Sequence, residues 1–438
     1  MKIDAPTPSD ARGRLLHGHD AVPTSSLRRL WRTGRSALGV GSAIARTRRG
    51  DPPSAEELEA IVAQLGGLKG VAMKVGQMLG YVDATVPESV RSMLALLQTA
   101  APSAPWHEVE ATVRASLGER ADALLSRLER EPIAVASIGQ VHRGQLPDGR
   151  AVVVKVRHRD IEAALRADFR SATLGKAFAA VSGAATVGEL IDEARTAFLE
   201  ECDFTLEARR QQQFAALFAD DPDLVVPAVV PEFCGAAVLV SVRVDGTDLT
   251  RWLAAAPDQA ARDRAGTALF RFWMRTLYRE GLFHADPHPG NFAFLGDGRI
   301  VLYDFGCVRS FEPSLRSGFA ELALAVRRDD VDAMSVALEA LGGRAPTDAR
   351  GRSELRRLLH GFFGPLRDEG ARSIALDEGT DARALMRDKL AIGRLQLPGR
   401  LLFLFRLRFG LYAVLAQIGS RVDWGALERS WAASIASA

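Results

Sequence analysis

His284-Ala-Asp-Pro-His-Pro-Gly-Asn291 is the stretch of this chain on which the prediction of its fold depends. Asp286 and Asn291 stand five positions apart in it, and both side chains offer oxygen atoms. Hard oxygen ligands of this kind are the ones that Mg²⁺ prefers. The stretch therefore predicts a loop that holds a divalent metal.

A predicted β-hairpin follows directly after this loop. Two short apolar runs, Phe292 to Phe294 and Ile300 to Tyr303, are separated by the turn Leu295-Gly-Asp-Gly298, and the second run leads into Asp304-Phe-Gly306. Because a hairpin brings its two ends together, we expect Asn291 and Asp304 to face one metal site despite their separation in sequence.

The spacing of Asp286 and Asn291 is that of the aspartate and asparagine in the catalytic loop of protein kinases. With Asp304-Phe-Gly306 at the end of the hairpin, the pattern predicts binding of ATP with Mg²⁺ and a carboxylate, Asp286, beside the attacking group. His284 occupies the position of the histidine that braces a kinase catalytic loop, so we interpret it as structural. His288 is interpreted as an ordinary surface or core histidine.

An upstream strand supplies a candidate lysine. In the run Arg150 to Arg157, the alternation predicts that Lys155 points away from the face that buries Val152, Val154 and Val156. A long helix is predicted from about Val187 to Ala219, and it carries the acids Glu200, Glu201, Asp203 and Glu207. Glu207 is expected to pair with Lys155 and to orient it toward phosphates, as in kinases.

Two nucleotide-binding motifs are missing from the chain. No G-x-G-x-x-G precedes Lys155, and its place is taken by Ala134, Val135, Ala136 and Ser137, followed by Ile138 and Gly139. There is also no Walker A motif, which argues against a P-loop enzyme.

In these motifs the chain resembles the UbiB/AarF family of atypical kinase-like proteins, which includes ubiquinone-biosynthesis accessory kinases. Lys74-Val-Gly-Gln77 resembles the family's K-x-G-Q signature, and Ala134 to Ser137 resembles its alanine-rich nucleotide loop, with the branched Val135 as a departure. Glu201-Cys-Asp203 with Glu207 resembles its E-x-D signature and adjoining glutamate. The resemblance spans about Ser54 to Val308.

The resemblance implies a two-lobed α+β protein-kinase-like fold that binds ATP or ADP with Mg²⁺. It assigns nucleotide contacts to the alanine-rich loop and to Lys155, with Glu201 and Asp203 close by. It also implies that a helix carrying Lys74 and Gln77 packs over the active site. The family is associated with suppressed protein-kinase activity, with ATPase activity, and with isoprenoid quinone or lipid metabolism.

The element pattern predicts four segments. Residues 1–50 form a basic tail, 51–128 a helical extension, 129–245 a strand-rich N-lobe with the long helix, and 246–438 a mostly helical C-lobe with one hairpin. In the extension one helix is expected from Trp106 to Leu128. The arginines of the tail, interspersed with apolar residues, suggest either a solvated segment or peripheral contact with anionic lipid.

Composition places the chain among ordinary globular proteins, with 47% hydrophobic and 25% charged residues. The net charge of +2 argues against nucleic acid as a partner. The odd number of separated cysteines (Cys202, Cys234 and Cys307) and the polar start favour a cytoplasmic location. Arg406 and Arg408 interrupt the apolar stretch Leu401 to Ile418, so we expect a buried helix rather than a membrane span.

Three functions remain open from the sequence. The first is an atypical kinase or ATPase that acts on a small molecule or lipid, which the intact set of Lys155, Glu207, Asp286, Asn291 and Asp304 favours. The second is a nucleotide-gated regulatory or binding protein with little phosphoryl transfer. The third is an aminoglycoside-type phosphotransferase, which the K-x-G-Q and E-x-D signatures disfavour.

Overall fold

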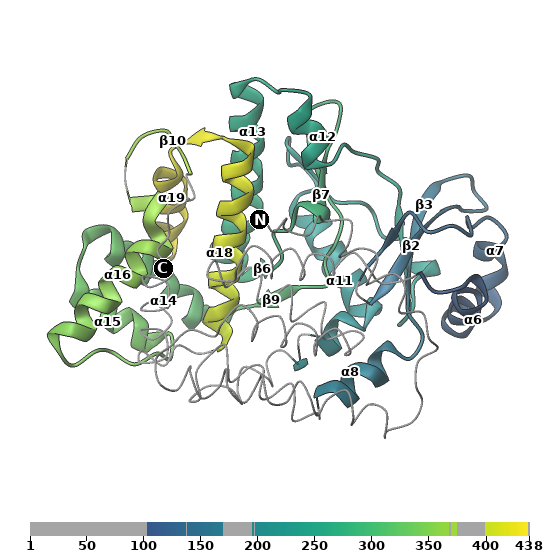
Figure 1. Cartoon of the computed structure of the whole chain (residues 1–438), viewed down its shortest axis with the longest axis horizontal. Helices are drawn as coiled ribbons and strands as arrows, with labels where there is room; N and C mark the ends of the chain where they lie inside the picture. Colours follow the sequence, from purple (N-terminus) through teal and green to yellow (C-terminus); the bar gives the residue numbers. More distant parts are fainter. Residues whose placement is uncertain are drawn as a thin grey trace, which may run out of the picture.

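A computed structural model describes residues 103–136, 138–169, 195–196, 198–367, 369–374 and 399–436 of the chain. The four-stranded sheet lies toward one end of the molecule, on the right of Figure 1 together with the helices of residues 106–125, and the helices of residues 313–367 and 424–436 gather at the other end. The two-lobed α+β arrangement predicted from the sequence is confirmed.

The strand-rich lobe is built around a four-stranded antiparallel sheet with the strand order β1-β2-β3-β5. Its elements are α6 (Trp106–Leu117), η1 (Gly118–Arg120), α7 (Ala121–Leu125), β1 (Ala134–Val135), β2 (Gly139–Gln145), β3 (Ala151–Arg157), α8 (Ile161–Phe169), α11 (Phe204–Leu217), β4 (Leu224–Val225), η2 (Pro231–Phe233) and β5 (Val238–Val242).

The second lobe is mostly helical and contains three short ladders. Its elements are α12 (Leu249–Ala254), α13 (Gln259–Phe270), the π-helical η3 (Arg271–Glu280), β6 (Leu282–His284), η4 (Pro289–Asn291), β7 (Phe292–Phe294), β8 (Ile300–Leu302), β9 (Val308–Ser310), α14 (Pro313–Arg328), α15 (Val331–Ala340), α16 (Ala349–Arg367), β10 (Arg372–Ser373), α18 (Gly399–Ile418), β11 (Arg421–Val422) and α19 (Trp424–Ala436).

The sheet of the strand-rich lobe buries one face against α6 and α7. Val152, Val154 and Val156 of β3 are at most 1% exposed and share a core with Val109 and Val113 of α6. The predicted alternation of β3 is therefore confirmed. Since α6 and α7 complete this core, they form one packed unit with the sheet.

The single helix expected from Trp106 to Leu128 is wrong. α6 ends at Leu117 because Gly118 takes a positive φ of 59°, a conformation that glycine reaches without steric cost. The chain then turns through η1 into the short helix α7. Apolar residues recur at helical spacing on both sides of this turn, so the sequence pattern did not reveal it.

The long helix expected over Val187 to Ala219 is also interrupted within the part that the structure describes. Residues 198–201 are helical, and α11 then begins at Phe204. Asp203 is its N-cap, because the carboxylate accepts hydrogen bonds from the backbone N–H groups of Thr205 at 2.9 Å and Leu206 at 3.3 Å. Asp203 therefore caps the helix that carries Glu207 and does not lie inside one long helix, as the prediction over Val187 to Ala219 implied.

α11 joins the two lobes of the molecule. Its glutamate faces the sheet, whereas Phe214 and the adjoining Phe218 lie in the core of the helical lobe, beside Phe272 and Phe305. The chain then enters β4, which pairs in parallel with β8. The C-terminal part of the helix is consequently tied to structure outside the sheet.

The predicted hairpin between the loop and Asp304 is confirmed. β7 and β8 pair in antiparallel fashion, with Phe292 opposite Leu302 and Phe294 opposite Ile300. Two further short ladders, β6–β9 and β10–β11, were not expected in the helical lobe. Their strands have only two or three residues, too few for a periodic signal to be recognised.

The predicted buried helix over Leu401 to Ile418 is confirmed as α18, in which Leu407, Leu411 and Leu415 are at most 1% exposed. Arg408 is equally buried and bonds to Glu428 of α19. Among the described residues, no helix combines the length and the apolar character that crossing a membrane requires.

Close approach of α13 to the segment before α19 gives a first prediction. A Cβ at Gly266 would overlap with Ser420 and lie 3.2 Å from Trp424. Gly266→Ala should lower the free energy of unfolding by about 1–3 kcal/mol, although alanine favours a helix. A Cβ added at Gly361 in α16 would meet no atom within 4 Å outside its own helix backbone, so Gly361→Ala should be neutral or stabilising by up to about 1 kcal/mol. Guanidinium denaturation that shows the same change in both variants would contradict the packing argument.

Candidate active site

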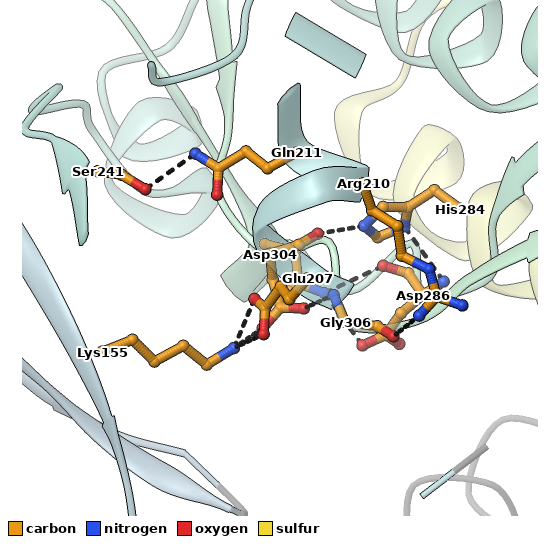
Figure 2. Close-up of polar contacts among 10 residues, drawn as sticks. Lys155, Glu207, Arg210, Gln211, Ser241, His284, Asp286, Asp304 and Gly306 are labelled. Atoms are coloured by element: carbon orange, nitrogen blue, oxygen red, sulfur yellow. Dashed lines mark hydrogen bonds and ion pairs between the residues drawn. The ribbon is translucent and has the colours of Figure 1, made fainter. Parts of the chain in front are cut away.

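A buried ion pair lies at the centre of the site. Lys155 Nζ is 2.7 Å and 3.0 Å from the two carboxylate oxygens of Glu207 and 3.0 Å from Asp304 Oδ2 (Figure 2). The Lys155 side chain is 13% exposed and the Glu207 side chain 1%. One strand, one helix and the end of the hairpin thus meet at one ammonium group.

The electrostatics of these three groups are coupled. Burial raises the pKa of Glu207 to about 7, against the opposing effect of Lys155 and with a further contribution from Asp304. Burial alone would lower the pKa of Lys155, but Asp304 and Glu207 outweigh it and raise that pKa above its ordinary value. Lys155 therefore stays charged.

His284 holds the loop and the hairpin together, as the sequence suggested. Its Nδ1 accepts hydrogen bonds from Trp273 Nε1 and from the backbone N–H of Asp286, each at 3.3 Å. Nε2 is then the protonated nitrogen, and it donates to the backbone carbonyl of Asp304. The imidazole is 1% exposed and is surrounded by aromatic rings, so it supports both acids without facing solvent.

The loop places Asn291 beside Asp286. Asn291 Nδ2 donates to the backbone carbonyl of Asp286 at 3.1 Å and to its carboxylate at 3.0 Å. These two bonds fix the orientation of the amide and leave Oδ1 for another ligand. At the other end of the hairpin, the N–H of Tyr303 bonds to the Asn291 carbonyl at 2.9 Å, which brings Asn291 next to Asp304.

Of the two acids of the E-x-D signature, the structure brings one to the site. Glu201 is 4% exposed and lies close to Gly306. A Cβ added at Gly306 would be 3.6 Å from Glu201 Cγ and 3.6 Å from Glu207 Oε2. The Asp203 carboxylate instead caps α11. Its predicted contact with a cofactor remains a prediction.

Arg210 of α11 is a residue that sequence reasoning missed. Its guanidinium donates to the Gly306 carbonyl at 3.1 Å and bonds to Glu200 at 2.7 Å. Arg309 of β9 approaches the same Glu200 oxygen at 2.7 Å. The i+3 spacing of Arg210 from Glu207 was visible, but nothing in the sequence showed that it would reach Gly306.

Ala134 of the alanine-rich loop lies on the same sheet face as Lys155, whereas Val135 is in register with Gln140 and Val156 and points to the opposite face. Ala134 pairs with Val141, and Val141 pairs with Lys155. Directly paired residues point to the same face of a sheet. The side chains of Ala134 and Val135 are exposed, and the N–H of Ala136 closes a turn on the Gly139 carbonyl at 2.7 Å.

The donor set fits Mg²⁺. Asp304 and Asn291 offer a carboxylate and an amide oxygen, with the Asp286 carboxylate 3.0 Å from Asn291 Nδ2 and the Lys155 ammonium 3.0 Å from Asp304. Among the described residues, no group of three or more His, Cys, Asp or Glu side chains is arranged around one metal position. Mg²⁺ commonly takes only one or two protein carboxylates and completes its shell with water and phosphate oxygens.

Three predicted site residues, Lys74, Gln77 and Ser137, lie outside the described residues. So does the basic segment 1–50. Their predicted contacts remain predictions.

Comparison with known proteins gives one consistent match. The family model described as the ABC1 atypical kinase-like domain matches residues 96–338. The mitochondrial atypical kinase COQ8 of Saccharomyces cerevisiae is 31% identical over 306 residues, which cover 66% of this chain and 61% of COQ8. The chloroplastic Protein ACTIVITY OF BC1 COMPLEX KINASE 1 of Arabidopsis thaliana is 32% identical over 69% of this chain and 45% of its own length. The chain thus spans roughly half to three fifths of these two relatives.

A solved structure agrees with the sequence match. The Rv3197–erythromycin complex from Mycobacterium tuberculosis is 29% identical, with a TM-score of 0.55, and the match covers 84% of this chain and 93% of that one.

Proposed function

Because this chain belongs to the ABC1 atypical kinase-like family, we propose that it binds ATP or ADP with Mg²⁺ and is an atypical kinase or ATPase. The observation that carries the proposal is the contact of Lys155 with both Glu207 and Asp304. A lysine held by a glutamate beside a metal-binding aspartate is the arrangement by which kinases position phosphates.

Each residue would have a distinct role in such a reaction. Asp304 and Asn291 would hold Mg²⁺, which neutralises phosphate charge when bound. Lys155 would bind phosphate oxygens, and Glu207 would keep its ammonium in place. Asp286, whose carboxylate is oriented by Asn291 at 3.0 Å, would accept the proton of the attacking water or hydroxyl. The side chain of Ala134 and the backbone of Val135 would contact the nucleotide.

The substrate is proposed to be a small molecule or lipid in isoprenoid quinone or lipid metabolism. The support comes from the names of relatives such as COQ8 and from the K-x-G-Q signature. Lys74 and Gln77 are proposed to lie over the site and to exclude protein substrates. The arginines of residues 1–50 are proposed to contact anionic lipid at a membrane surface.

Nucleotide titrations test the core of this proposal. ATP or ADP should raise the melting temperature in a saturable manner, and the effect should require Mg²⁺. Slow ATP hydrolysis is expected, with little transfer to generic proteins. Binding without any turnover would favour the nucleotide-gated regulatory alternative. Absence of stabilisation by ATP with Mg²⁺ would exclude both. Lipid and metabolite profiles of a deletion strain would then identify the pathway.

Lys155→Met provides the second prediction. Loss of its charge-assisted hydrogen bonds, about 1.5–3 kcal/mol, should weaken nucleotide binding by about tenfold or more. The substitution also leaves Glu207 buried without its partner, which should destabilise the fold. The double variant Lys155→Met/Glu207→Gln separates the two effects, because it should recover stability but not affinity. Calorimetric titration that gives unchanged affinity for the single variant would show that Lys155 does not contact the nucleotide.

A further inference from the structure

One carboxylate outside the candidate site, that of Glu200, connects three segments of the chain. Its Oε2 lies 2.7 Å from Arg210 Nη2 of α11 and 2.7 Å from Arg309 Nη1 of β9. Glu200 belongs to the helical residues 198–201 before the break, and it directly precedes the E-x-D signature. Residues 198–201, α11 and β9 therefore meet at a single oxygen atom.

Arg210 carries this contact to the segment that contains Asp304. Its guanidinium also donates to the Gly306 carbonyl at 3.1 Å, as Figure 2 shows. The Gly306 N–H in turn donates to Asp304 Oδ1 at 3.0 Å. Arg210 stands three positions after Glu207, the partner of Lys155, on the same helix. The position of α11 and the orientation of the Asp304 carboxylate are thus linked through one side chain.

Arg309 makes the corresponding link on the far side of Asp304. It lies in β9, which follows Asp304-Phe-Gly306 in the chain. β9 pairs with β6, where Phe283 is opposite Arg309 and His284 is the next residue. Glu200 therefore restrains the strand that leaves the candidate metal site, beside the strand that enters the loop with Asp286.

The contacts of Glu200 differ in two respects from an ordinary surface ion pair such as Glu110 with Arg114. The Glu200 side chain is 33% exposed, but those of Arg210 and Arg309 are only 13% and 12% exposed, so solvent screens these contacts less. Its partners also stand 10 and 109 positions away, whereas Glu110 and Arg114 pair within α6. A pair within one helix cannot fix one element against another, and the contacts of Glu200 can.

We propose, resting on the function proposed above, that Glu200 is a positioning residue for the ATP and Mg²⁺ site. In many protein kinases a phosphate group on the activation segment bonds to arginines and thereby orders that segment and the helix with the glutamate. Here a carboxylate of the chain itself bonds to one arginine on the helix and to one on the strand after Asp-Phe-Gly. The site is therefore assembled without phosphorylation.

Glu200→Gln in the full chain tests this role, because the amide keeps the size of the side chain and removes its charge. Calorimetric titration should show about 3- to 10-fold weaker binding of ATP with Mg²⁺, since a neutral acceptor holds the two guanidinium groups less strongly. Half-maximal binding should also require more Mg²⁺, because the Asp304 carboxylate is less well oriented. Glu200→Asp keeps the charge and should recover part of the loss.

Two comparisons accompany this titration. Glu110→Gln is the matched control, because Glu110 is 39% exposed and bonds to Arg114 at 2.9 Å, and it should bind ATP with Mg²⁺ as the unmodified chain does. Phosphatase treatment of the unmodified chain should leave its affinity unchanged. Should Glu200→Gln not fold, Arg210→Lys gives the same test, because one ammonium cannot reproduce the fork that reaches both Glu200 and Gly306.

Hydrogen exchange without nucleotide separates the positioning role from the proposed function. Glu200→Gln should speed exchange of the backbone amides of residues 204–210 and 304–310, and Glu110→Gln should not. Equal exchange in the two variants would overturn the ordering role of Glu200. Unchanged affinity in Glu200→Gln, or binding that is lost on phosphatase treatment, would overturn it while the proposed function stands. No binding of ATP with Mg²⁺ by the unmodified chain would instead overturn the proposed function.

Discussion

Asp304→Asn should remove the Mg²⁺ dependence of ATP binding and reduce any ATP turnover by about 100-fold or more. The asparagine has nearly the same shape and can still accept the hydrogen bond that Gly306 N–H donates at 3.0 Å. It lacks the charge on which metal binding depends, and the metal supplies several kcal/mol of stabilisation to a transferring phosphoryl group. The change therefore affects chemistry more than folding.

The measurement combines thermal shift with ATP hydrolysis, each with and without Mg²⁺. Asp297→Asn is the matched control, because Asp297 lies in the turn of the same hairpin, is 52% exposed and, among the described residues, forms an ion pair only with nearby Arg299. It should behave as the unmodified protein does. An Asp304→Asn protein that keeps metal-dependent stabilisation by ATP would remove Asp304 from the metal site.

Arg408→Leu should destabilise the helical lobe by about 3–5 kcal/mol, because it leaves a buried carboxylate without its partner. Glu428 is 4% exposed, and Arg408 Nη1 also donates to the hydroxyl of Tyr412 at 3.2 Å. The guanidinium lies 4.4 Å from the ring centroid of Phe363 and 4.8 Å from that of Phe362. The burial and the ring contacts that hold the ion pair in one geometry also make its disruption costly.

Urea denaturation of three proteins tests this prediction. Arg408→Leu/Glu428→Leu should recover most of the lost stability, because an apolar pair of similar volume replaces the ion pair. Arg251→Leu, at an 84% exposed position, should change little. If Arg408→Leu were as stable as this control, the buried pair would contribute nothing to the fold.

The sequence predicted those parts of the site that depend on local order. The hairpin between Asn291 and Asp304 followed from a turn of Gly-Asp-Gly between two apolar runs, and the orientation of Lys155 followed from the alternation in β3. The register of this alternation also depends on the turn before β3. In that turn Gly149 takes a φ of 90°, and its N–H donates to the Leu146 carbonyl. Neighbouring residues alone determine features of this kind.

Contacts between distant segments could not be predicted in the same way. Nothing near Arg408 in sequence indicates that its counter-ion is Glu428, and nothing near Arg210 indicates Gly306. The prediction missed the break before α11 because it placed Asp203 inside the helix, although aspartate favours the N-cap position over a helix interior. Tertiary packing decides between the two, through Arg157, which binds the Cys202 carbonyl at the break.

The attachment of α11 to the helical lobe through Arg210 and Phe214 has a mechanical consequence. Protein kinases are commonly switched by movement of the helix that carries the glutamate partner of the lysine. Here Arg210 fastens one part of that helix to Gly306, while Phe214 anchors the other part in the core of the helical lobe. Rotation of α11 would have to break one of these two contacts. Regulation of this protein is therefore expected to act on access to the site rather than on rotation of α11.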